Sequence, residues 1–548
     1  MKIRRAVLAP VAIATIALAT GGWFLQRGVS REGNVYTQAR LFEEVLHRIS
    51  DDYVDEKDPS SLYKMAIDGL IHELGDPYTA FMTPEDYQNL QVTTRGEYGG
   101  IGSEITKRDG WITIMAPLPG SPSERAGLQP GDKIVEIEGV STRGLSQDDA
   151  VAKLRGPKGT VVEFKVARTG IDELIPFRLV REEIHVKSVR TSYLMEGDIG
   201  YIELRTFSET TTRELRAAID ELRKEGMKGL VIDVRANPGG LLEQAITASD
   251  LFLNRGQVVS ELRGRVAGMN QRFVAQSPDQ YPGMPIVVLT GAQTASASEI
   301  LAGSLQDHDR ALVVGETTFG KGLVQTLFQL PAGHWLKMTT ARWYTPVGRS
   351  IQRPLATDTS LEELGEEGEE EEVETYRTDA GRIIYGGGGI TPDLIVEPDT
   401  FTEAEIEFVK AVQKHGSKYY DLLYQYAIDY HHEHPDLEPG FEVTDELLDG
   451  FFETLNANGV PVSRELFDGA SRWVGQDLGY QVTYTRWNPQ EARKRANQHD
   501  PQVKVALELL RKADSPEMLF EQAERYAVRT LPLDREEDSR TGGAGADR

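Results

Sequence analysis

Two short segments of this chain carry side chains able to do covalent chemistry together. Residues 294–299, TASASE, offer the hydroxyl of Ser296, and residues 319–325, FGKGLVQ, offer the amine of Lys321. A serine hydroxyl is a weak nucleophile until a neighbouring base removes its proton. A lysine amine can be that base where its surroundings favour the neutral form. The pair therefore favours a serine hydrolase whose base is a lysine instead of a histidine.

Ser296 is expected at the point where a buried strand meets a helix. Residues 286–289 form an unbroken apolar run typical of a buried strand, and residues 296–305 are expected to be helical. The first turn of a helix has N–H groups without acceptors and a partial positive charge. The N–H of Ala297 is therefore expected to stabilise an oxyanion formed beside the serine. An isolated Ser-Ala-Ser would more often only cap a helix, so this interpretation depends on Lys321.

The surroundings of Lys321 suit a base. It lies between Gly320 and Gly322 in an otherwise apolar stretch. Burial lowers the pKa of a lysine, because the charged form loses its hydration. If the segment is a strand, Gln325 points to the same face and can orient the amine.

A glycine-rich turn is expected to supply a second oxyanion donor. Residues 233–240, DVRANPGG, end a strand predicted over residues 229–234. Glycine lets a backbone approach a substrate closely. The N–H of Gly239 or Gly240 is therefore a candidate to face the developing negative charge. Taken alone, such a turn would more often be structural.

Other sites are weaker alternatives. Residues 315–321 have the spacing of a P-loop, but Gly322 stands where a magnesium-binding Ser or Thr is required. His308 lies about 18 Å from Ser296 along a continuous helix, which is too far for its base. No Gly-x-Ser-x-Gly motif surrounds the serine, so an α/β-hydrolase is not expected. The histidines in residues 431–434 fit charge at a helix end better than a metal site. We expect no metal and no other cofactor.

The charge and the first residues limit partners and location. The chain has 548 residues, no cysteine and a net charge of −26. Disulfides and thiolate metal sites are excluded, and nucleic acid is not expected as a partner. Basic residues precede an apolar run over residues 6–25, which is long enough to cross a bilayer. This pattern predicts a membrane anchor, or a signal peptide cleaved near residues 17–19. The protein is then expected in the cell envelope, held on the inner membrane and facing the periplasm or another extracytoplasmic side, or secreted there.

Periodicity and composition divide the chain into segments. These are a signal anchor or signal peptide (1–28), a helical segment (29–95), a β-rich domain (96–172), an α/β core (173–400) with an acidic insertion (360–374), a helical extension (401–528) and a disordered tail (529–548). Alternating strands and helices in the core favour a multidomain α/β fold. The apolar repeat of the first helical segment serves either internal packing or a homo-oligomer.

The β-rich segment resembles a PDZ domain of the circularly permuted bacterial type. Its order of strands and helix agrees, and residues 126–132, AGLQPGD, form the most specific motif. In such a domain, backbone N–H groups capture the terminal carboxylate of a peptide, and a sheet edge adds the peptide as a strand. The resemblance implies that the glycine-rich loop of Gly99, Gly100, Ile101 and Gly102 binds the peptide.

The motifs together resemble those of the carboxyl-terminal processing proteases, also called tail-specific proteases. The likeness covers roughly residues 37–400, and its motifs are residues 127–132, 237–240, 296–300, 320–325, 381–382 and 386–393. It implies a serine endopeptidase with Ser296 as nucleophile, Lys321 as general base and Gln325 as the partner that orients the base. It also implies an oxyanion hole made by Ala297 and by Gly239 or Gly240.

The resemblance implies partners as well. Members of the family recognise C-terminal tails of proteins through the PDZ domain and cleave near them, and in several the PDZ domain is a gate. Thr294 stands where the family has the first serine of its motif. The acidic insertion and the long extension depart from the simplest members and leave regulation and assembly open. The alternative function is an exported PDZ scaffold whose silent core binds tails without cleaving them.

Overall fold

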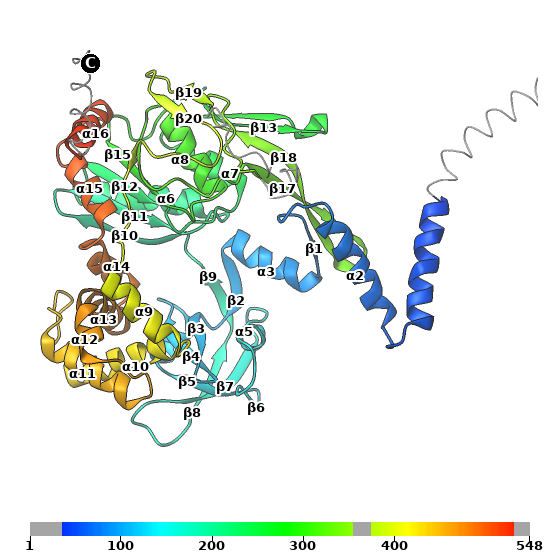
Figure 1. Ribbon diagram of the computed structural model, residues 1–548, viewed down its shortest axis with the longest axis vertical. Helices are drawn as coiled ribbons and strands as arrows, with labels where there is room; N and C mark the ends of the chain where they lie inside the picture. Colours follow the sequence, from blue (N-terminus) through cyan, green and yellow to red (C-terminus); the bar gives the residue numbers. More distant parts are fainter. Residues whose placement is uncertain (1–35, 355–373, 531–548) are drawn as a thin grey trace, which may run out of the picture. The chain divides into compact units, whose positions relative to one another are not determined.

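The computed structural model describes residues 36–354 and 374–530, which fall into two units (Figure 1). The described part of the first unit comprises residues 36–83 and 326–339, and the second unit contains the rest. The predicted signal anchor, the acidic insertion up to residue 373 and the tail from residue 531 lie outside the described residues. Within the described residues, no helix has the length and apolar character needed to span a membrane.

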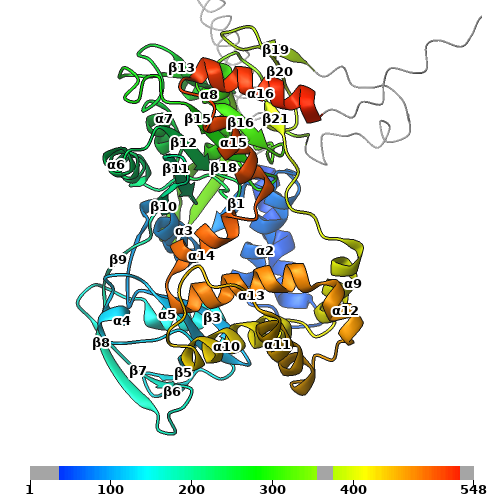
Figure 2. The same ribbon diagram turned by 90° about the vertical axis from the view of Figure 1, so that its left-hand side faces the viewer.

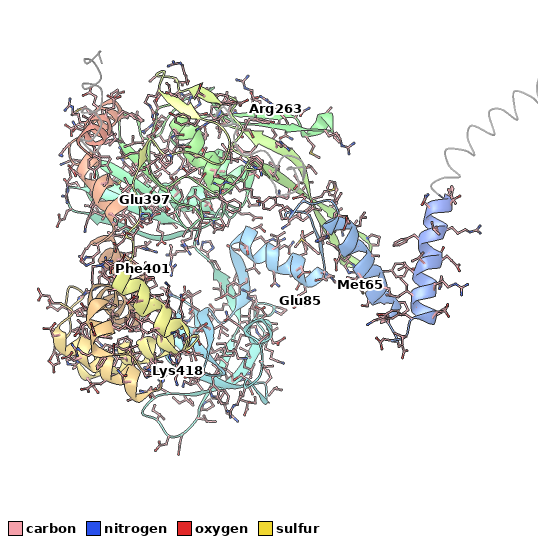
Figure 3. All side chains as sticks on the ribbon, in the orientation of Figure 1. Met65, Glu85, Arg263, Glu397, Phe401 and Lys418 are labelled. Carbon is pink, nitrogen blue, oxygen red and sulfur yellow. The ribbon has the colours of Figure 1, made fainter. Side chains whose placement is uncertain are left out.

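The first unit combines two helices with short strands. Its elements are a helix over residues 36–52, α2 (Pro59–His72), β1 (Ala80–Met82) and the first part of β18 (Trp335–Tyr344), which pairs antiparallel with β1. The α2 helix begins after Asp58, whose carboxylate accepts a hydrogen bond from the N–H of Ser61 at 3.1 Å. Large apolar side chains remain exposed on both helices, including Leu41 (59%), Leu70 (68%) and Met65 (60%, labelled in Figure 3).

In the second unit, the β-rich domain is a sheet packed against one helix. Its elements are β3 (Ser103–Arg108), β4 (Trp111–Pro117), α4 (Pro122–Arg125), β5 (Lys133–Ile137), β6 (Val140–Ser141), α5 (Gln147–Leu154), β7 (Val161–Ala167) and β8 (Ile175–Val180). The strand order is β3-β4-β5-β7-β8, with β6 beside β5, so β3 is an edge strand. Alternation along β4 directs Ile112 and Ile114 to the core that Ala150 and Leu154 of α5 also enter. A separate pair, β2 (Glu97–Gly100) and β9 (Glu182–His185), lies where the chain enters and leaves the domain.

The α/β core is built on a six-stranded sheet, as the alternation of strands and helices predicted. Its order is β10 (Val189–Met195), β11 (Ile199–Leu204), β12 (Gly229–Asp233), β15 (Ile286–Thr290), β16 (Leu312–Gly315) and β21 (Leu394–Ile395). Only β10 is antiparallel to its neighbour. The helices on one face of this sheet are α6 (Thr211–Lys224), α7 (Leu242–Ser249) and α8 (Ala297–Asp307). A further helix, α3 (Pro84–Arg95), precedes the β-rich domain. A smaller sheet contains β13 (Val258–Gly264), β14 (Gln271–Val274), the start of β17 (Leu323–Gln329) and the rest of β18.

The C-terminal extension covers the other face of the six-stranded sheet, which the sequence did not predict. In β12, Leu230 and Ile232 pack on the side of α6 to α8, whereas Val231 packs with Val503 and Leu509 of α15 (Pro501–Leu510). The next helix, α16 (Pro516–Thr530), lies on the same side (Figure 2). Parallel strands need cover on both faces. The extension is therefore part of the core.

The remaining helices of the extension form a core of their own. They are α9 (Glu403–Gln413), α10 (Lys418–Glu433), α11 (Asp445–Ala457), α12 (Arg464–Gly469), α13 (Ser471–Arg486) and α14 (Pro489–Asn497). A capping box of Thr402 and Glu405 begins α9. Phe401, labelled in Figure 3, packs edge-on against Trp473 with ring centroids 5.7 Å apart.

The extension also holds the β-rich domain. Arg108 of β3 forms an ion pair with Asp421 of α10 at 3.2 Å. The hydroxyl of Tyr424, also on α10, donates to the carbonyl of Ile114 in β4 at 3.0 Å. One segment of the chain, residues 401–530, thus contacts both the β-rich domain and the six-stranded sheet.

Candidate active site

Ser296 occupies a strained turn between β15 and α8. Its backbone has φ 56° and ψ −114°, a region that a residue with a side chain rarely adopts. Such a conformation costs of the order of 1–3 kcal/mol and persists where the surrounding structure enforces it. The flanking glycines of an α/β-hydrolase elbow are absent, as the sequence indicated. The serine side chain stays partly exposed although α8 itself is fully buried.

The turn after β12 is fastened to the serine loop through one buried asparagine. The amide nitrogen of Asn237 donates to the carbonyl of Leu204 at 2.9 Å, and its amide oxygen accepts from the N–H of Gly239 at 2.9 Å. The backbone carbonyl of Asn237 accepts from the N–H of Ala295 at 3.1 Å and from the hydroxyl of Ser298 at 3.0 Å. The predicted glycine turn and the predicted nucleophile therefore share one hydrogen-bond network.

Two of the predicted oxyanion donors have N–H groups without an acceptor among the described residues. They belong to Ala297, the first residue of α8, and to Gly240. The N–H of Gly239 is taken by Asn237, so the structure favours Gly240 of the two glycines. Gly239 still has to be glycine. Its φ is +98°, and a Cβ there would lie 2.9 Å from the Cβ of Ser296.

The Glu299 carboxylate joins the serine turn to the lysine loop. One of its oxygens, Oε2, accepts from the N–H of Ser296 at 2.7 Å and from the N–H of Lys321 at 2.9 Å. The other, Oε1, accepts from the N–H of Gly320 at 2.7 Å and from the hydroxyl of Thr318 at 2.5 Å. Burial raises the pKa of this carboxyl, and the donated hydrogen bonds oppose that rise. All four groups donate hydrogen bonds, and a carboxylate has two oxygens to accept them. A neutral amide has only one such oxygen and could not accept all four.

Lys321 enters the site from a loop and not from a strand. Gly320 before it has a positive φ of +88°, and the carbonyl of Lys321 accepts from the indole N–H of Trp343 at 3.0 Å. Strand β17 begins only at Leu323, so Lys321 lies outside it. The alternation of side chains along a strand therefore does not place Lys321 and Gln325 on one face, as it would if the whole segment were a strand. Gln325 lies partly exposed at the third position of β17.

Glu299 and Asn237 lie within the predicted motifs, but the sequence did not indicate a role for either residue. A signal for Glu299 was present, since a Glu three residues after a helix-starting Ser is typical of a capping box. The same contacts explain the spacing that resembles a P-loop. The N–H groups of Gly320 and Lys321 do hold an anion, but it is the Glu299 side chain.

The histidine alternatives are structural. The ring of His308 lies 2.8 Å from the carboxylate of Asp379 and 2.7 Å from the carbonyl of Val258. Burial lowers the pKa of His431 to about 4, so this ring is neutral at pH 7 and does not supply the helix-end charge that the sequence favoured. In the described residues, no cluster of three or more His, Asp or Glu side chains is arranged to hold a metal ion.

The predicted peptide-binding loop is divided between two environments. Ile101 and Gly102 line a cavity of about 50 Å³, and their N–H groups have no acceptor in the part of the chain that the structure describes. Gly99 instead packs on the backbone of Gly156, where a Cβ would lie 2.1 Å from a carbonyl oxygen. Gly100 is the last residue of β2. The structure thus brings only the second half of the loop to the cavity.

That cavity lies between the edge strand β3 and helix α5. Its other lining residues are Tyr98, Ser103, Ile105, Val151, Leu154 and Arg155. It therefore combines two N–H groups at one end with a largely apolar wall and an adjacent strand edge. These features suit the terminal carboxylate and last side chain of an extended peptide.

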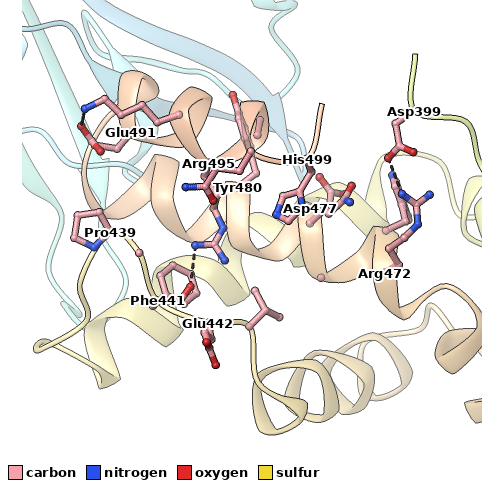
Figure 4. A pocket seen from close by; sticks show the side chains of 18 of the residues that line it. Asp399, Pro439, Phe441, Glu442, Arg472, Asp477, Tyr480, Glu491, Arg495 and His499 are labelled. Atoms are coloured by element: carbon pink, nitrogen blue, oxygen red, sulfur yellow. Dashed lines mark hydrogen bonds and ion pairs between the residues drawn. The ribbon is translucent and has the colours of Figure 1, made fainter. Parts of the chain in front are cut away.

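A further cavity, of about 1140 Å³, lies in the C-terminal extension (Figure 4). Arg472, Asp477, Arg495 and His499 are among its lining residues. Burial raises the pKa of Asp477 to about 6. None of the residues predicted from the sequence as site residues lines this cavity.

Comparison with known proteins identifies three regions of the chain. Residues 198–361 match Peptidase family S41, residues 113–168 match the PDZ domain, and residues 25–86 match the Activating protease CtpB N-terminal domain. The chain is 41% identical over 327 residues to a carboxy-terminal-processing protease of Bartonella bacilliformis, covering 59% of this chain and 74% of that protein. It is 39% identical to the carboxy-terminal processing protease CtpA of Bacillus subtilis, covering 56% of this chain and 65% of the relative.

A solved structure is also similar. The photosystem II D1 C-terminal processing protease is 30% identical, with 64% of this chain and 85% of that chain covered and a TM-score of 0.34. The family of this chain is shown by its sequence relatives, above all by the Bartonella protein, of which it covers 74% at 41% identity. The chain therefore belongs to the carboxy-terminal-processing protease family of peptidase family S41, and it is a serine-type peptidase with a PDZ domain.

Proposed function

We propose that this peptidase cleaves proteins near their C-terminal tails with Ser296 as nucleophile, Lys321 as general base and Gln325 as the residue that orients the base. The observation that carries the proposal is the Glu299 carboxylate, one oxygen of which binds the backbone N–H groups of Ser296 and Lys321. This contact fixes the two chain segments beside each other. A nucleophile and its base need such fixed proximity to act in one step.

The chemistry follows from the groups at the turn. The neutral amine of Lys321 takes the hydroxyl proton of Ser296 while the serine oxygen attacks the peptide carbonyl. The N–H groups of Ala297 and Gly240 stabilise the oxyanion that forms. The protonated amine then gives its proton to the leaving nitrogen, and water releases the acyl group by the same route in reverse. Because the amine must be neutral, activity falls as the pH drops.

Glu299 acts in this scheme as a positioning residue. Its four hydrogen bonds hold the backbone of the nucleophile and the base loop, and it does not touch the substrate in the mechanism. An error of about 1 Å in the placement of reacting groups can cost of the order of 100-fold in rate. Glu299 is thus needed for the rate of the chemical step and not for binding the tail.

The PDZ domain supplies the tail specificity. The N–H groups of Ile101 and Gly102 bind the terminal carboxylate, and the peptide pairs with edge strand β3. The alternative function, a PDZ scaffold without catalytic activity, also includes tail binding. It does not require the strained backbone at Ser296. Strain of this kind is typical of sites whose geometry is needed for function. It therefore favours the enzyme over the scaffold.

The location and assembly proposed from the sequence rest on separate features. The basic and apolar residues before residue 28 export the protein and anchor it, or are cleaved after export. External protease added to spheroplasts should degrade it, and resistance to that protease would contradict export.

Exposed Leu41 and Val45 on the helix over residues 36–52 form the surface of a homo-oligomer. Light scattering that gives a monomer at micromolar concentration would rule this out.

Loss of either reacting side chain should abolish cleavage. Ser296→Ala removes the nucleophile and Lys321→Ala removes the base, so both variants should lose at least about 1000-fold in kcat. The measurement is fragment release from an unstructured protein such as casein by the full chain. Melting temperatures close to that of the parent would exclude unfolding as the cause. Full activity in either variant would refute the assignment.

Replacing Glu299 should slow the chemistry without weakening tail binding. Glu299→Gln puts an NH2 group where two of the four donors now find an oxygen, so kcat should fall about 100-fold. Glu316→Gln, in the same loop but outside the carboxylate contacts, is the matched control. Steady-state kinetics and the affinity for a tail peptide are measured in parallel. A kcat within twofold of the control would show that the bridge is dispensable.

Tail binding should depend on a free carboxylate at the cavity between β3 and α5. Val151→Asp places a negative charge in the cavity wall and should weaken binding of an apolar-ended peptide by about tenfold or more. Val140→Asp, on exposed β6, should leave the affinity unchanged. The affinity for the free-acid peptide and for its C-terminal amide is measured by fluorescence anisotropy. Equal affinity for acid and amide would contradict the proposed capture of the carboxylate.

A further inference from the structure

Arg235 links the oxyanion turn to the C-terminal extension. It lies within the turn that leads from β12 to Gly240, and its side chain folds back onto the strand end. Nε donates to Oδ1 of Asp233 at 3.0 Å, and Nη2 donates to Oδ2 at 2.6 Å. Burial alone would raise the pKa of Asp233, but the charge and hydrogen bonds of Arg235 lower it, so the pair is ionised.

The other nitrogen of the guanidinium is held by the extension. Nη1 of Arg235 donates to Oδ2 of Asp500 at 2.6 Å and to Oε1 of Gln502 at 2.8 Å. Asp500 is itself fixed, because its Oδ1 caps α15 by accepting from the N–H groups of Gln502 and Val503. Gln502 is fixed as well, because its Nε2 donates to the carbonyl of Val396 at 2.7 Å. Both acceptors are therefore rigid.

The turn transmits this restraint to the candidate oxyanion hole. The N–H of Asn237 donates to the carbonyl of Val234 at 3.1 Å, which makes Arg235 the second residue of a tight turn that ends at Asn237. Asn237 in turn holds Gly239 and the loop before Ser296. A shift of Arg235 would move the fourth residue of its turn, and with it the two glycines.

We propose that Asp500 and Gln502 of the C-terminal extension are positioning residues for the oxyanion hole, which they hold in place through Arg235. The proposal rests on the function proposed above for Gly240 and Ala297. The extension then has two tasks: its apolar face covers the sheet, and its polar end at the start of α15 fixes the turn. Positioning by well-ordered charge-assisted hydrogen bonds is a recurrent way to keep a reacting geometry rigid.

Asp500→Asn tests the proposal in the full-length protein. The variant keeps an oxygen to cap α15 but presents an NH2 group to Arg235, so the charged contact is lost. We expect kcat for casein cleavage, and the rate at which a fluorophosphonate labels Ser296, to fall about tenfold. The affinity for a tail peptide should stay the same. Arg511→Gln, which breaks the 2.8 Å ion pair between the extension and Glu196, is the matched control and should retain the parent rates.

Two further variants separate positioning from stability. Gln502→Met removes the second acceptor without touching the α15 cap, and it decides the question if Asp500→Asn lowers the melting temperature. Asp500→Glu keeps a carboxylate for Arg235 and should retain more of the rate than Asp500→Asn. A role in stability alone would not give this difference at a temperature well below melting.

The outcomes distinguish this proposal from the function on which it rests. If Ser296→Ala is inactive while Asp500→Asn and Gln502→Met match Arg511→Gln in both rates, the positioning role is refuted and the proposed function stands. If Ser296→Ala still cleaves, both fall. A loss of tail affinity in parallel with kcat would also overturn the positioning role, because it would indicate a general disturbance of the domains.

Discussion

One buried carboxylate holds the candidate active site together. Glu299 is fully buried and accepts hydrogen bonds from the serine turn and from the lysine loop. These segments follow different β-strands, and the proposed chemistry needs them side by side. A buried carboxylate is costly unless its oxygens are fully hydrogen-bonded. That condition makes the arrangement specific, because moving either segment would leave a charge unsatisfied.

The six-stranded sheet and the C-terminal extension hold this arrangement in place. The parallel strands β12 and β15 end at the glycine turn and at the serine turn, so neighbouring strand ends bring the two motifs together. Asn237 then joins the turns by hydrogen bonds. The sheet keeps its geometry because both faces are covered, one by α6 to α8 and the other by α15 and α16. The extension also contacts the PDZ domain, so the cavity proposed for tail binding and the turn that carries Ser296 share one scaffold.

Several elements around the candidate site could be predicted because their signals are local. The apolar run before Ser296 indicated a buried strand, and the residues around Lys321 indicated an apolar stretch, considered as a strand, where the structure has a loop. Gly239 and Gly240 could not be told apart, since the difference lies in the side chain of Asn237, which occupies one N–H and leaves the other. The orientation of Gln325 was also beyond the sequence, because β17 starts two residues after Lys321. The role of α15 was missed because a helical apolar pattern does not say which surface the helix covers.

The central claim is that the neutral amine of Lys321 activates the hydroxyl of Ser296. The rate of labelling by a fluorophosphonate, measured across pH with the adduct located by mass spectrometry, tests it most directly, because labelling needs no substrate recognition. The account predicts that the label is on Ser296, that its rate rises with pH through one ionisation, and that this ionisation disappears in Lys321→Met. A label on another residue, or the same pH profile in Lys321→Met, would contradict the account.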